Sequence, residues 1–480
     1  GRSRGGRAAE GGEDSARMPV LLPDEPLRSL DEYVDLFDGG QGLLRCRELG
    51  PDAVVESIAS SGLRGRGGAG FPAGRKWDSV RAGGPETGDR YVVANGAEGE
   101  PGTFKDRMLM RRNPYQVIEG LTIAVAAVGA VHGFVAVKAS FGPELAALER
   151  ALVELDDAGL LGDVPIEIVA GPDEYLFGEE KALLEVIEGE DPLPRVFPPY
   201  LYGLFTAAPQ VGWSAGIDLS SDGVEVPSAN PTLVTNVETL ANVVPILGRG
   251  PEWYRTLGTE ASPGVVLCTV VGDTRRAGVA EIELGTPLRE AIDLIGGGAR
   301  PGREVKAVIS GVANPVLTAD QLDTPISYEG MEAAGSGLGA VGFIVYDDTA
   351  DMVAVAHTLS RFLYVESCGQ CPACKFGTGE VTAYLERILA GTATEHDVEV
   401  ISARLDTVTD ANRCFLGAQE QRVVGSILGA FPREFVAHLE GRAPRPADEP
   451  VPKLVDIRDG VALYDERQAR KQPDWTYAGE

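Results

Sequence analysis

Residues 62–77, GLRGRGGAGFPAGRKW, contain the spacing G-x-G-x-x-G, which is the fingerprint of a dinucleotide-binding turn. That fingerprint requires a strand before it and a helix after it, because the pyrophosphate binds at the N-terminus of the helix. Here residues 52–63 space their apolar side chains like a short amphipathic helix, and Pro72, a helix breaker, stands where the next helix should open. The context therefore disfavours an ordinary Rossmann turn.

Two other interpretations of residues 62–72, the glycine loop, remain open. Glycines expose backbone N–H groups, and these groups together with nearby cations are suited to holding a phosphate against a flat ring. The alternative is a flexible surface loop. The glycines are Gly62, Gly65, Gly67, Gly68 and Gly70, and the nearby cations are Arg64, Arg66, Arg75 and Lys76.

Composition and charge exclude several classes of protein. The chain has 480 residues, 44% hydrophobic and 24% charged, which is typical of a globular protein of roughly two to four domains. Its formal net charge of −29 disfavours a nucleic-acid groove or an anionic membrane surface as partner. Because there is no apolar run long enough to span a membrane and no apolar signal segment in residues 1–18, we expect a cytoplasmic protein with no membrane insertion.

The periodicity of the chain predicts its organisation. From about residue 90 to 190, β-rich runs alternate with helical ones, which is typical of an α/β layer with a mainly parallel sheet. Residues 263–345 indicate a small α+β unit, and residues 350–440 are helical in pattern. The expected parts are a disordered leader and N-terminal segment (1–45), an α/β domain (46–250), an α+β domain (260–347), a helical domain (350–442) and a C-terminal tail (443–480).

Four cysteines carry the clearest chemical signal. Three of them form C-x2-C-x2-C within ESCGQCPACKFG, and the fourth follows far downstream in NRCFLGAQEQ. Structural zinc usually takes two separate C-x2-C pairs or two cysteines and two histidines, whereas a close triplet completed by a distant thiolate is typical of a [4Fe-4S] cluster. Zinc and unligated core thiols remain as alternatives. The expected cluster ligands are Cys368, Cys371, Cys374 and Cys414, while Cys46 and Cys268 are interpreted as ordinary buried thiols.

A cluster implies a second cofactor. Because a cluster carries one electron at a time, a protein that holds one generally needs a group that converts hydride transfer into single-electron steps, and a flavin does this. FMN offers one phosphate and a flat ring that requires glycine at close approach. The glycine loop is therefore interpreted as a site for non-covalent FMN.

Five motifs in the same order resemble the 51 kDa-type flavoprotein subunit of respiratory complex I NADH dehydrogenase and its relatives in NAD-linked hydrogenases and formate dehydrogenases. The resemblance covers about residues 50–440. It implies a Rossmann-like but non-standard FMN-binding α/β domain, a ubiquitin-like (β-grasp, SLBB-type) domain and a helical bundle that carries the cluster. In that family NADH reduces the flavin, and electrons leave singly through the cluster. The motifs are GLRGRGGAGFPAGRKW, NGAEGEPGTFKDR, YLFGEEKALLEVIEG, PTLVTNVETL and ESCGQCPACKFG.

The resemblance also implies roles for single residues. Positions matching the flavin site are Gly65, Gly67, Gly68, Lys76, Asn95, Glu98, Gly99, Asn236 and Thr239. Positions matching the surroundings of the nicotinamide nucleotide are Phe71, Glu100, Tyr175, Glu179 and Glu180, with Glu100 as the candidate catalytic residue. Structural alternatives stay open for three of them: Glu100 as a cap of the helix that follows it, and Glu179 and Glu180 as acids favoured by a helix N-terminus.

Departures from the family pattern gather around the nucleotide. Ala97 replaces an acidic residue, Ser79 an aromatic one and Phe197 a basic one. A segment at 210–229 is inserted before NPTLVTNVET, and its Trp213 is a candidate to stack on adenine. These departures keep two other functions open: an electron relay with a degenerate nucleotide site that serves only protein partners, and a non-enzymatic scaffold with a structural cluster.

The resemblance finally implies partners. Because the remaining two cysteines offer no second cluster, electrons must pass to other chains. The expected partners are a thioredoxin-like [2Fe-2S] subunit near the flavin and a larger iron–sulfur subunit near the helical bundle.

Overall fold

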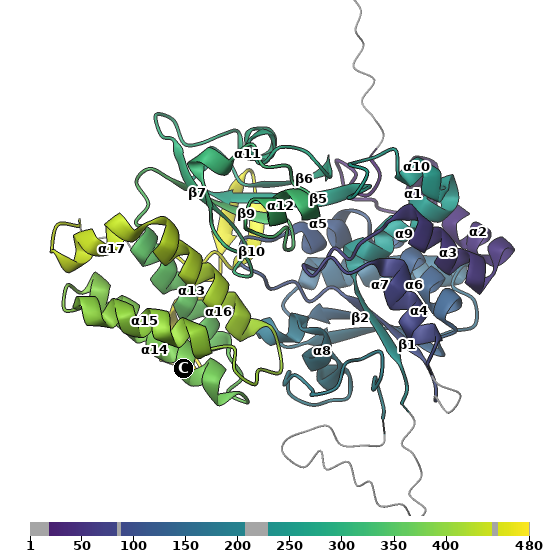
Figure 1. Ribbon diagram of the computed structural model, residues 1–480. Helices are drawn as coiled ribbons and strands as arrows, with labels where there is room; N and C mark the ends of the chain where they lie inside the picture. Colours follow the sequence, from purple (N-terminus) through teal and green to yellow (C-terminus); the bar gives the residue numbers. More distant parts are fainter. Residues whose placement is uncertain (1–18, 84–87, 207–228, 444–449, 480) are drawn as a thin grey trace, which may run out of the picture.

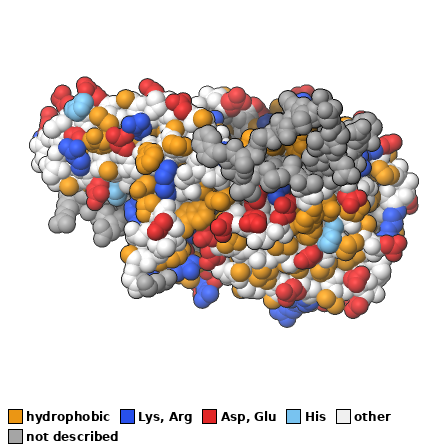
Figure 2. All heavy atoms as spheres, turned by 90° about the horizontal axis from the view of Figure 1, so that it is seen from below, with side chains coloured by type: hydrophobic (Ala, Val, Ile, Leu, Met, Phe, Trp, Pro, Cys, Tyr) orange, Lys and Arg blue, Asp and Glu red, His pale blue; other side chains and the backbone are white. Residues whose placement is uncertain are grey.

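The computed structural model describes residues 19–83, 88–206, 229–443 and 450–479. Figure 1 shows three folded parts: an α/β part, a part built on a mixed sheet, and a helical bundle. A hairpin of C-terminal residues, drawn in yellow, lies between the bundle and the α/β part. On the face shown in Figure 2, Asp and Glu side chains are spread over the visible surface with apolar side chains between them, as the net negative charge requires.

The α/β part contains a four-stranded sheet with the order β3-β2-β1-β4, in which every pairing is parallel. Apolar runs such as YVVAN form the central strands, because parallel strands are buried on both faces. The predicted parallel sheet is confirmed. Asn95 ends β1 and is paired with Asn236 at the end of β4, so two predicted site residues lie side by side at one edge. The strands are β1 (Tyr91–Asn95), β2 (His132–Lys138), β3 (Ile166–Gly171) and β4 (Thr232–Asn236).

The helices of the α/β part are α1 (Leu30–Phe37), α2 (Gln41–Leu49), α3 (Pro51–Ser61), α4 (Ala73–Arg81), α5 (Lys105–Arg112), α6 (Pro114–Val128), α7 (Gly142–Asp157), α8 (Glu180–Ile187), α9 (Val237–Arg249), α10 (Pro251–Tyr254) and the short 3-10 helix η1 (Tyr175–Gly178). Helices α6 and α9 pack closely against each other. A Cβ atom on Gly120 of α6 would lie 2.1 Å from the carbonyl oxygen of Leu240, so this approach requires glycine.

The glycine loop joins two helices, α3 and α4, instead of a strand and a helix. Helix α3 buries Val54, Val55 and Ile58, as its periodicity predicts. The expectation that Pro72 excludes a helix here is wrong, because α4 begins at the next residue with Pro72 as its N-cap. Proline is tolerated at this place, since the first N–H groups of a helix have no partner within it. Because a helix, and not a strand, precedes the loop, it differs from a Rossmann turn.

A five-stranded mixed sheet with the order β6-β5-β9-β7-β8 forms the second part. Strands β5 and β9 are parallel, and the other pairings are antiparallel. Cys268 is fully buried in β5, and Cys46 is buried in α2, as expected for core thiols. The elements are β5 (Val265–Gly272), β6 (Gly278–Glu283), α11 (Leu288–Gly296), β7 (Val305–Ser310), β8 (Leu317–Thr318), the 3-10 helix η3 (Ala319–Gln321), α12 (Tyr328–Ala333) and β9 (Gly342–Asp347).

The bundle consists of α13 (Met352–Glu366), α14 (Pro372–Leu389), α15 (Glu395–Thr407), α16 (Leu416–Ala430) and α17 (Pro432–Leu439), which confirms the predicted helical C-terminal part. The helical pattern expected over 350–440 is interrupted near its end, because Pro432 cannot continue α16 and instead opens α17. Within the described ranges, no helix has both the length and the apolar character needed to cross a membrane.

Part of the expected C-terminal tail is folded. Residues 450–479 form β10 (Leu454–Arg458), β11 (Val461–Tyr464) and the 3-10 helix η4 (Glu466–Arg470). Lys471 and Glu366, whose side chains are fully buried, form an ion pair of 2.8 Å that joins this segment to α13. The hairpin turn contains Asp459 and Gly460, both with positive φ, which is the Asp-Gly turn signal. The N-terminal segment is also held where it is described, since the backbone N–H groups of residues 20–22 donate to Glu281.

Candidate functional site

A cavity of about 720 Å³ lies where the three parts meet. Its volume is in the range of about 300–1,000 Å³ that is typical of cofactor sites. Loops of the part built on the mixed sheet contribute Ala313, Asn314, Gly339 and Ala340, and the bundle contributes Cys414, Phe415, Leu416, Gln419 and Arg422. The cavity therefore joins the predicted flavin region to one of the predicted cluster ligands.

Every position that the resemblance assigns to flavin or nucleotide lines this cavity, although the positions come from four separate stretches of the chain. They are Gly65, Gly67, Gly68, Phe71, Lys76, Asn95, Glu98, Gly99, Glu100, Tyr175, Glu179, Glu180, Asn236 and Thr239. The carboxyl ends of β1 and β4 supply two of these stretches, and the glycine loop lies across them.

The glycine loop is shaped to leave room for a ligand. A Cβ atom on Gly67 would lie 3.2 Å from Cβ of Asn236, and Gly68 has a φ of +116°. A larger residue would therefore narrow the cradle or strain the backbone. Thr239 Oγ1 accepts from the backbone N–H of Arg66 over 2.8 Å and holds the loop at the start of α9.

Two of the four expected phosphate cations have other roles. Arg66 is buried, and its guanidinium donates to the hydroxyl of Tyr254 and to the carbonyl of Val265. Arg64 lies over the ring of Tyr328, 3.8 Å from its centroid. Of the four cations, only Lys76 lines the cavity. The local pattern of residues carries no sign of this difference, because it depends on contacts with the mixed sheet.

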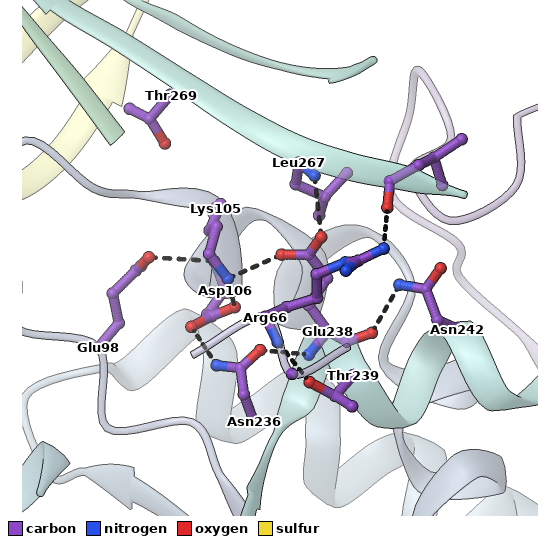
Figure 3. Close-up of polar contacts among 12 residues, drawn as sticks. Arg66, Glu98, Lys105, Asp106, Asn236, Glu238, Thr239, Asn242, Leu267 and Thr269 are labelled. Carbon is purple, nitrogen blue, oxygen red and sulfur yellow. Dashed lines mark hydrogen bonds and ion pairs between the residues drawn. The ribbon is translucent and has the colours of Figure 1, made fainter. Parts of the chain in front are cut away.

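A buried network of charges forms the floor beneath the loop (Figure 3). Lys105 Nζ lies 2.6 Å from Asp106 Oδ1 and 2.7 Å from Glu238 Oε2. Asn236 Nδ2 donates to the other oxygen of Asp106 over 2.7 Å, and Glu238 also accepts from the backbone N–H of Leu267 in β5. These contacts fix Asn236 before any ligand binds, and they connect the cavity floor to the mixed sheet.

The two neighbouring glutamates, Glu98 and Glu100, have different environments. Glu98 accepts from the backbone N–H groups of Asp106 and Arg107, each over 3.2 Å, at the start of α5. Burial, followed by the nearby charge of Asp106, raises the pKa of Glu98 to about 7. The alternative that Glu100 caps this helix is therefore wrong, because Glu98 does so.

Glu100 is instead connected to the other parts of the protein. Its carboxylate accepts from the Tyr175 hydroxyl over 2.5 Å and from the backbone N–H of Val312 over 2.6 Å. Burial raises the pKa of Glu100, although these two donors oppose the shift. Glu100 is thus a carboxyl group that faces the cavity and is held by two further segments of the chain.

The two neighbouring glutamates at the start of α8, Glu179 and Glu180, also have different contacts. Glu179 is the N-cap, with its carboxylate accepting from the N–H groups of Lys181 and Ala182, so the helix-terminus alternative holds for this residue. Burial raises the pKa of Glu179 to about 7. Glu180 reaches Lys76 with an ion pair of 2.7 Å. The loop cation and the acidic helix terminus are therefore in direct contact at the wall of the cavity.

The four expected cluster ligands lie at one end of the bundle, around the N-termini of α14 and α16. Cys371 and Cys374 are buried, and Cys368 and Cys414 are half-buried. Burial is the largest cause that raises the pKa of Cys374 to about 11 and of Cys414 to about 12, and neighbouring thiols add to both shifts. An all-thiol donor set of this spacing fits an iron–sulfur cluster. Among the described residues, no three Cys, His, Asp or Glu side chains are gathered closely enough to hold a single metal ion.

The departures from the family pattern lie mostly away from the cavity. Ala97 lines it, but Ser79 and Phe197 do not. Ser79 donates to the Lys76 carbonyl on the exposed face of α4, and the ring of Phe197 packs 4.9 Å from that of Tyr202. Trp213 lies outside the described residues. The departures at Ser79 and Phe197 therefore leave the lining of the cavity unchanged.

Comparison with known proteins agrees with this geometry. The model of the family described as "Nuo51 FMN-binding domain" matches residues 58–245, and that of the "NADH-ubiquinone oxidoreductase-F iron-sulfur binding region" matches residues 354–438. The chain is 38% identical over 444 residues to the F 2 subunit of NADH-quinone oxidoreductase from Rhizobium meliloti (strain 1021), covering 88% of this chain and 98% of that protein. It is 33% identical over 423 residues to the HndC subunit of NADP-reducing hydrogenase from Solidesulfovibrio fructosivorans, covering 86% of this chain and 81% of that one.

A solved structure has the same fold over most of the chain. The NAD+-reducing [NiFe]-hydrogenase in its H2-reduced state matches with a TM-score of 0.72 and 32% identity, covering 86% of this chain and 67% of that one. The chain belongs to the family of NADH-quinone oxidoreductase F subunits, the FMN- and [4Fe-4S]-carrying components of these oxidoreductases.

Proposed function

We propose that this chain accepts a hydride from NADH at a bound FMN and passes the electrons one at a time, through a [4Fe-4S] cluster, to iron–sulfur partner subunits. One observation carries this conclusion: the same cavity is lined by the glycine loop, by the acidic nucleotide positions and by Cys414. A relay with a degenerate nucleotide site is less well supported, because all five nucleotide positions still line that cavity. A scaffold would have no use for the arrangement.

The residues present fit FMN. Gly65, Gly67 and Gly68 would lie against the flat ring, while Lys76 and the backbone N–H groups of the loop supply charge and donors for one phosphate. Asn95, Glu98, Gly99, Asn236 and Thr239 complete the proposed flavin site. The charge network below them holds Asn236 in place, whereas Lys76, which pairs with Glu180, would exchange that carboxylate for the phosphate. When bound, FMN supplies the conversion between hydride transfer and single-electron transfer.

The nucleotide would enter on the acidic side of the cavity. Phe71, which is 49% exposed, offers a ring at the cavity wall. Tyr175, Glu179 and Glu180 also line the cavity, and we assign Glu100 the role of orienting the nicotinamide amide as an ionised hydrogen-bond acceptor. A precise orientation of this kind is the main contribution that a protein makes to hydride transfer between bound rings.

The proposed cluster ligands are Cys368, Cys371, Cys374 and Cys414. Because Cys414 belongs both to this set and to the cavity lining, electrons leaving the flavin would reach the cluster without crossing a further segment. Phe376 and Phe415, which are 75% and 48% exposed, lie close in sequence to these ligands. Exposed aromatic side chains are enriched at interfaces, which supports docking of the larger iron–sulfur subunit at this end of the bundle. A thioredoxin-like [2Fe-2S] subunit near the flavin is the second proposed partner.

The proposed domains are an N-terminal segment (1–45), the FMN domain (46–250), an SLBB-type ubiquitin-like domain (260–347), the cluster domain (350–442) and a C-terminal segment (443–480). The strand order β6-β5-β9-β7-β8, with one helix between β6 and β7 in the chain, supports a β-grasp assignment for the second domain. We place the protein in the cytoplasm, as the cytosolic cysteine pattern suggests.

Anaerobic titration tests the function. NADH, and separately NADPH, is added to the purified protein while the flavin absorbance and the cluster EPR signal are followed. Bleaching of the flavin followed by appearance of the cluster signal is the expected result. A protein with full FMN and iron content that neither nucleotide reduces would contradict the proposal. Acid-released flavin should be FMN, and recovery of FAD would contradict the assignment of the loop.

A further inference from the structure

The turn that carries Tyr175 is held from the bundle at three points. Its backbone N–H donates to Glu366 Oε2 over 3.1 Å, and its ring packs edge-on against Phe362 with centroids 5.2 Å apart. Gln419 Nε2 donates to its hydroxyl over 2.6 Å. Gln419 is only 7% exposed and lines the cavity, although neither the motifs nor the resemblance assigns it a role.

Two of these anchors lie beside the cluster ligands in sequence. Glu366 is the last residue of α13, directly before the loop that carries Cys368. Gln419 is in the first turn of α16, which begins after Cys414. The two segments that carry the cysteines therefore also hold the nucleotide-site turn.

The hydrogen bonds have a defined direction. The amide nitrogen of Gln419 can only donate, so it leaves the single hydroxyl proton of Tyr175 available for another acceptor. That acceptor is Glu100 Oε2, at 2.5 Å, while Val312 N donates to Glu100 Oε1 over 2.6 Å. The bundle thus determines, through one tyrosine, which group donates to the candidate catalytic carboxylate.

We propose that Gln419 is a positioning residue of the nucleotide site, which acts on Glu100 through Tyr175. This rests on the proposed function, in which Glu100 and Tyr175 contact the nicotinamide nucleotide. Gln419 keeps the Tyr175 ring in one orientation and directs its proton to Glu100. The geometry of the nucleotide site then depends on the segments that carry the cluster.

Gln419→Glu is the sharpest test, because the side chain keeps its size while its carboxylate can only accept. The new carboxylate competes with Glu100 for the Tyr175 proton. It also adds a negative charge near the Glu100 carboxylate. Both effects raise the pKa of Glu100 further, so the ionised form is lost at a higher pH as the medium is acidified. The acid limb of the profile of kcat/KM for NADH should therefore move to higher pH, and NADH affinity at pH 7 should fall about tenfold.

Gln421→Glu is the matched control. Gln421 lies on the same helix, but its side chain donates to the Leu405 carbonyl over 2.7 Å and does not line the cavity. The same charge is therefore added to α16 in both variants, while the Tyr175 hydroxyl is affected in only one of them.

Other charged groups face Glu100 and stay unchanged in both variants. In the large cavity they are Lys76, Glu98, Asp106, Glu179, Glu180 and Arg422, together with the thiol of Cys414. A smaller cavity of about 90 Å³ shares the wall at residues 98–100 with the large one, and its charged groups are Arg107, Lys138, Asp173, Lys453, Asp465 and Arg467. Because this background is common to the pair of variants, a difference between their acid limbs reports the Gln419 contact.

The assay uses the holoprotein with ferricyanide as acceptor, and NADH binding is measured separately by flavin fluorescence. FMN content and the cluster EPR signal are recorded for every variant. If Gln419→Glu loses a cofactor, Gln419→Leu removes the donor without adding charge and should still weaken NADH binding more than Gln421→Leu. In a Tyr175→Phe background, Gln419→Leu, which adds no charge, should change NADH binding little, since the connecting hydroxyl is absent.

The outcomes separate the two proposals. Equal acid limbs and equal NADH affinities for the Gln419 and Gln421 variants, in proteins with full cofactor content, would overturn the role of Gln419 and leave the proposed function standing. A wild-type protein with full FMN that NADH does not reduce would overturn the proposed function and this inference with it.

Discussion

The α/β part and the helical bundle both bury acidic side chains near the cavity, but they compensate them differently. In the α/β part, buried Glu238 and Asp106 share the ammonium group of Lys105 at 2.6–2.7 Å. In the bundle, Glu420 is fully buried with the Ser360 hydroxyl as donor at 2.6 Å, and among the described residues its second oxygen has no partner. Burial raises the pKa of Glu420 to about 8.

The difference shows what each region requires. A network of paired charges keeps its geometry without a ligand, so the floor of the flavin cavity is a property of the chain alone. In the cluster region, burial raises the pKa of the Glu420 carboxyl and of the Cys374 and Cys414 thiols, and bound iron would favour the thiolate forms of the cysteines. The floor of the cavity is therefore formed by the chain alone, whereas we expect the proposed cluster site to be completed by its ligand.

Removal of one proposed cluster ligand is expected to have the largest effect. Cys414→Ser should lose the whole cluster, because the site then lacks a thiolate for one iron. FMN should be retained, since the charge network does not involve the bundle. Iron and acid-labile sulfide analysis, with flavin analysis on the same sample, measures both. Cys46→Ser is the control, and loss of iron from it instead of from Cys414→Ser would contradict the assignment.

A change in the charge network should instead weaken FMN binding and the stability of the protein. Lys105→Met leaves Glu238 and Asp106 buried without their cation, and breaking a buried pair in this way costs about 3–5 kcal/mol. We expect a lower free energy of unfolding and weaker FMN binding, measured by denaturant titration and flavin fluorescence.

The control for that prediction is Arg45→Met, which removes an exposed ion pair with Glu48. Exposed pairs of this kind contribute about 0–1 kcal/mol. Similar losses in the two variants would mean that the network does not stabilise the cavity floor.

A smaller effect tests the glycine cradle without disturbing the charges. In Gly67→Ala, the new Cβ lies 3.2 Å from Cβ of Asn236, which also lines the cavity, so it crowds this part of the lining. FMN affinity should fall about tenfold, equivalent to about 1.4 kcal/mol, while the melting temperature of the FMN-free protein changes little. Gly142→Ala is the control, because a Cβ there meets nothing within 4 Å. Equal FMN affinities in the two variants would argue against close approach at Gly67.

Features that are encoded locally can be predicted from the sequence. The apolar runs predict the parallel strands, and the cysteine spacing singles out the four cysteines that the bundle brings to one end. Three of the loop glycines, Gly62, Gly68 and Gly70, have the positive φ that favours glycine. The Asp-Gly turn at 459–460 is a usable local signal for the C-terminal hairpin, although the expected tail did not include one.

Features that depend on contacts between distant segments cannot be predicted in this way. The loop pattern directs Arg66 to a phosphate, yet Tyr254 and Val265 bind its guanidinium. Glu98 and Glu100 are not distinguished by their motif, because which of them caps α5 depends on how the loop bends. Gln419 carries no motif, and its role follows only from the position of α16 against η1. A single sequence gives the residues that make such contacts, but it does not show which residue contacts which.

The smallest effect concerns Glu420 itself. Its folded pKa of about 8 lies above the ordinary value of 4.5, so between these pH values the folded chain keeps a proton that the unfolded chain has lost. The free energy of unfolding of the wild type should therefore fall as pH rises through this window. Glu420→Gln has no group that titrates here, so its free energy of unfolding should not show this slope. Its amide N–H2, however, would lie where the unpaired oxygen is and would have no acceptor, which costs the variant about 1–3 kcal/mol of stability at every pH.

The expected result is a reversal of the order of stability with pH. Glu420→Gln should be less stable than the wild type at pH 6 and more stable at pH 8, with a difference on the order of 1 kcal/mol at each end. Melting temperatures of the holoproteins at the two pH values measure this. Glu399→Gln, at an exposed position of α15, should show no such reversal, because the Glu399 side chain is 77% exposed. Parallel pH profiles for wild type and Glu420→Gln would mean that Glu420 is ionised in the folded protein, and that the bundle compensates its buried charge as the α/β part does.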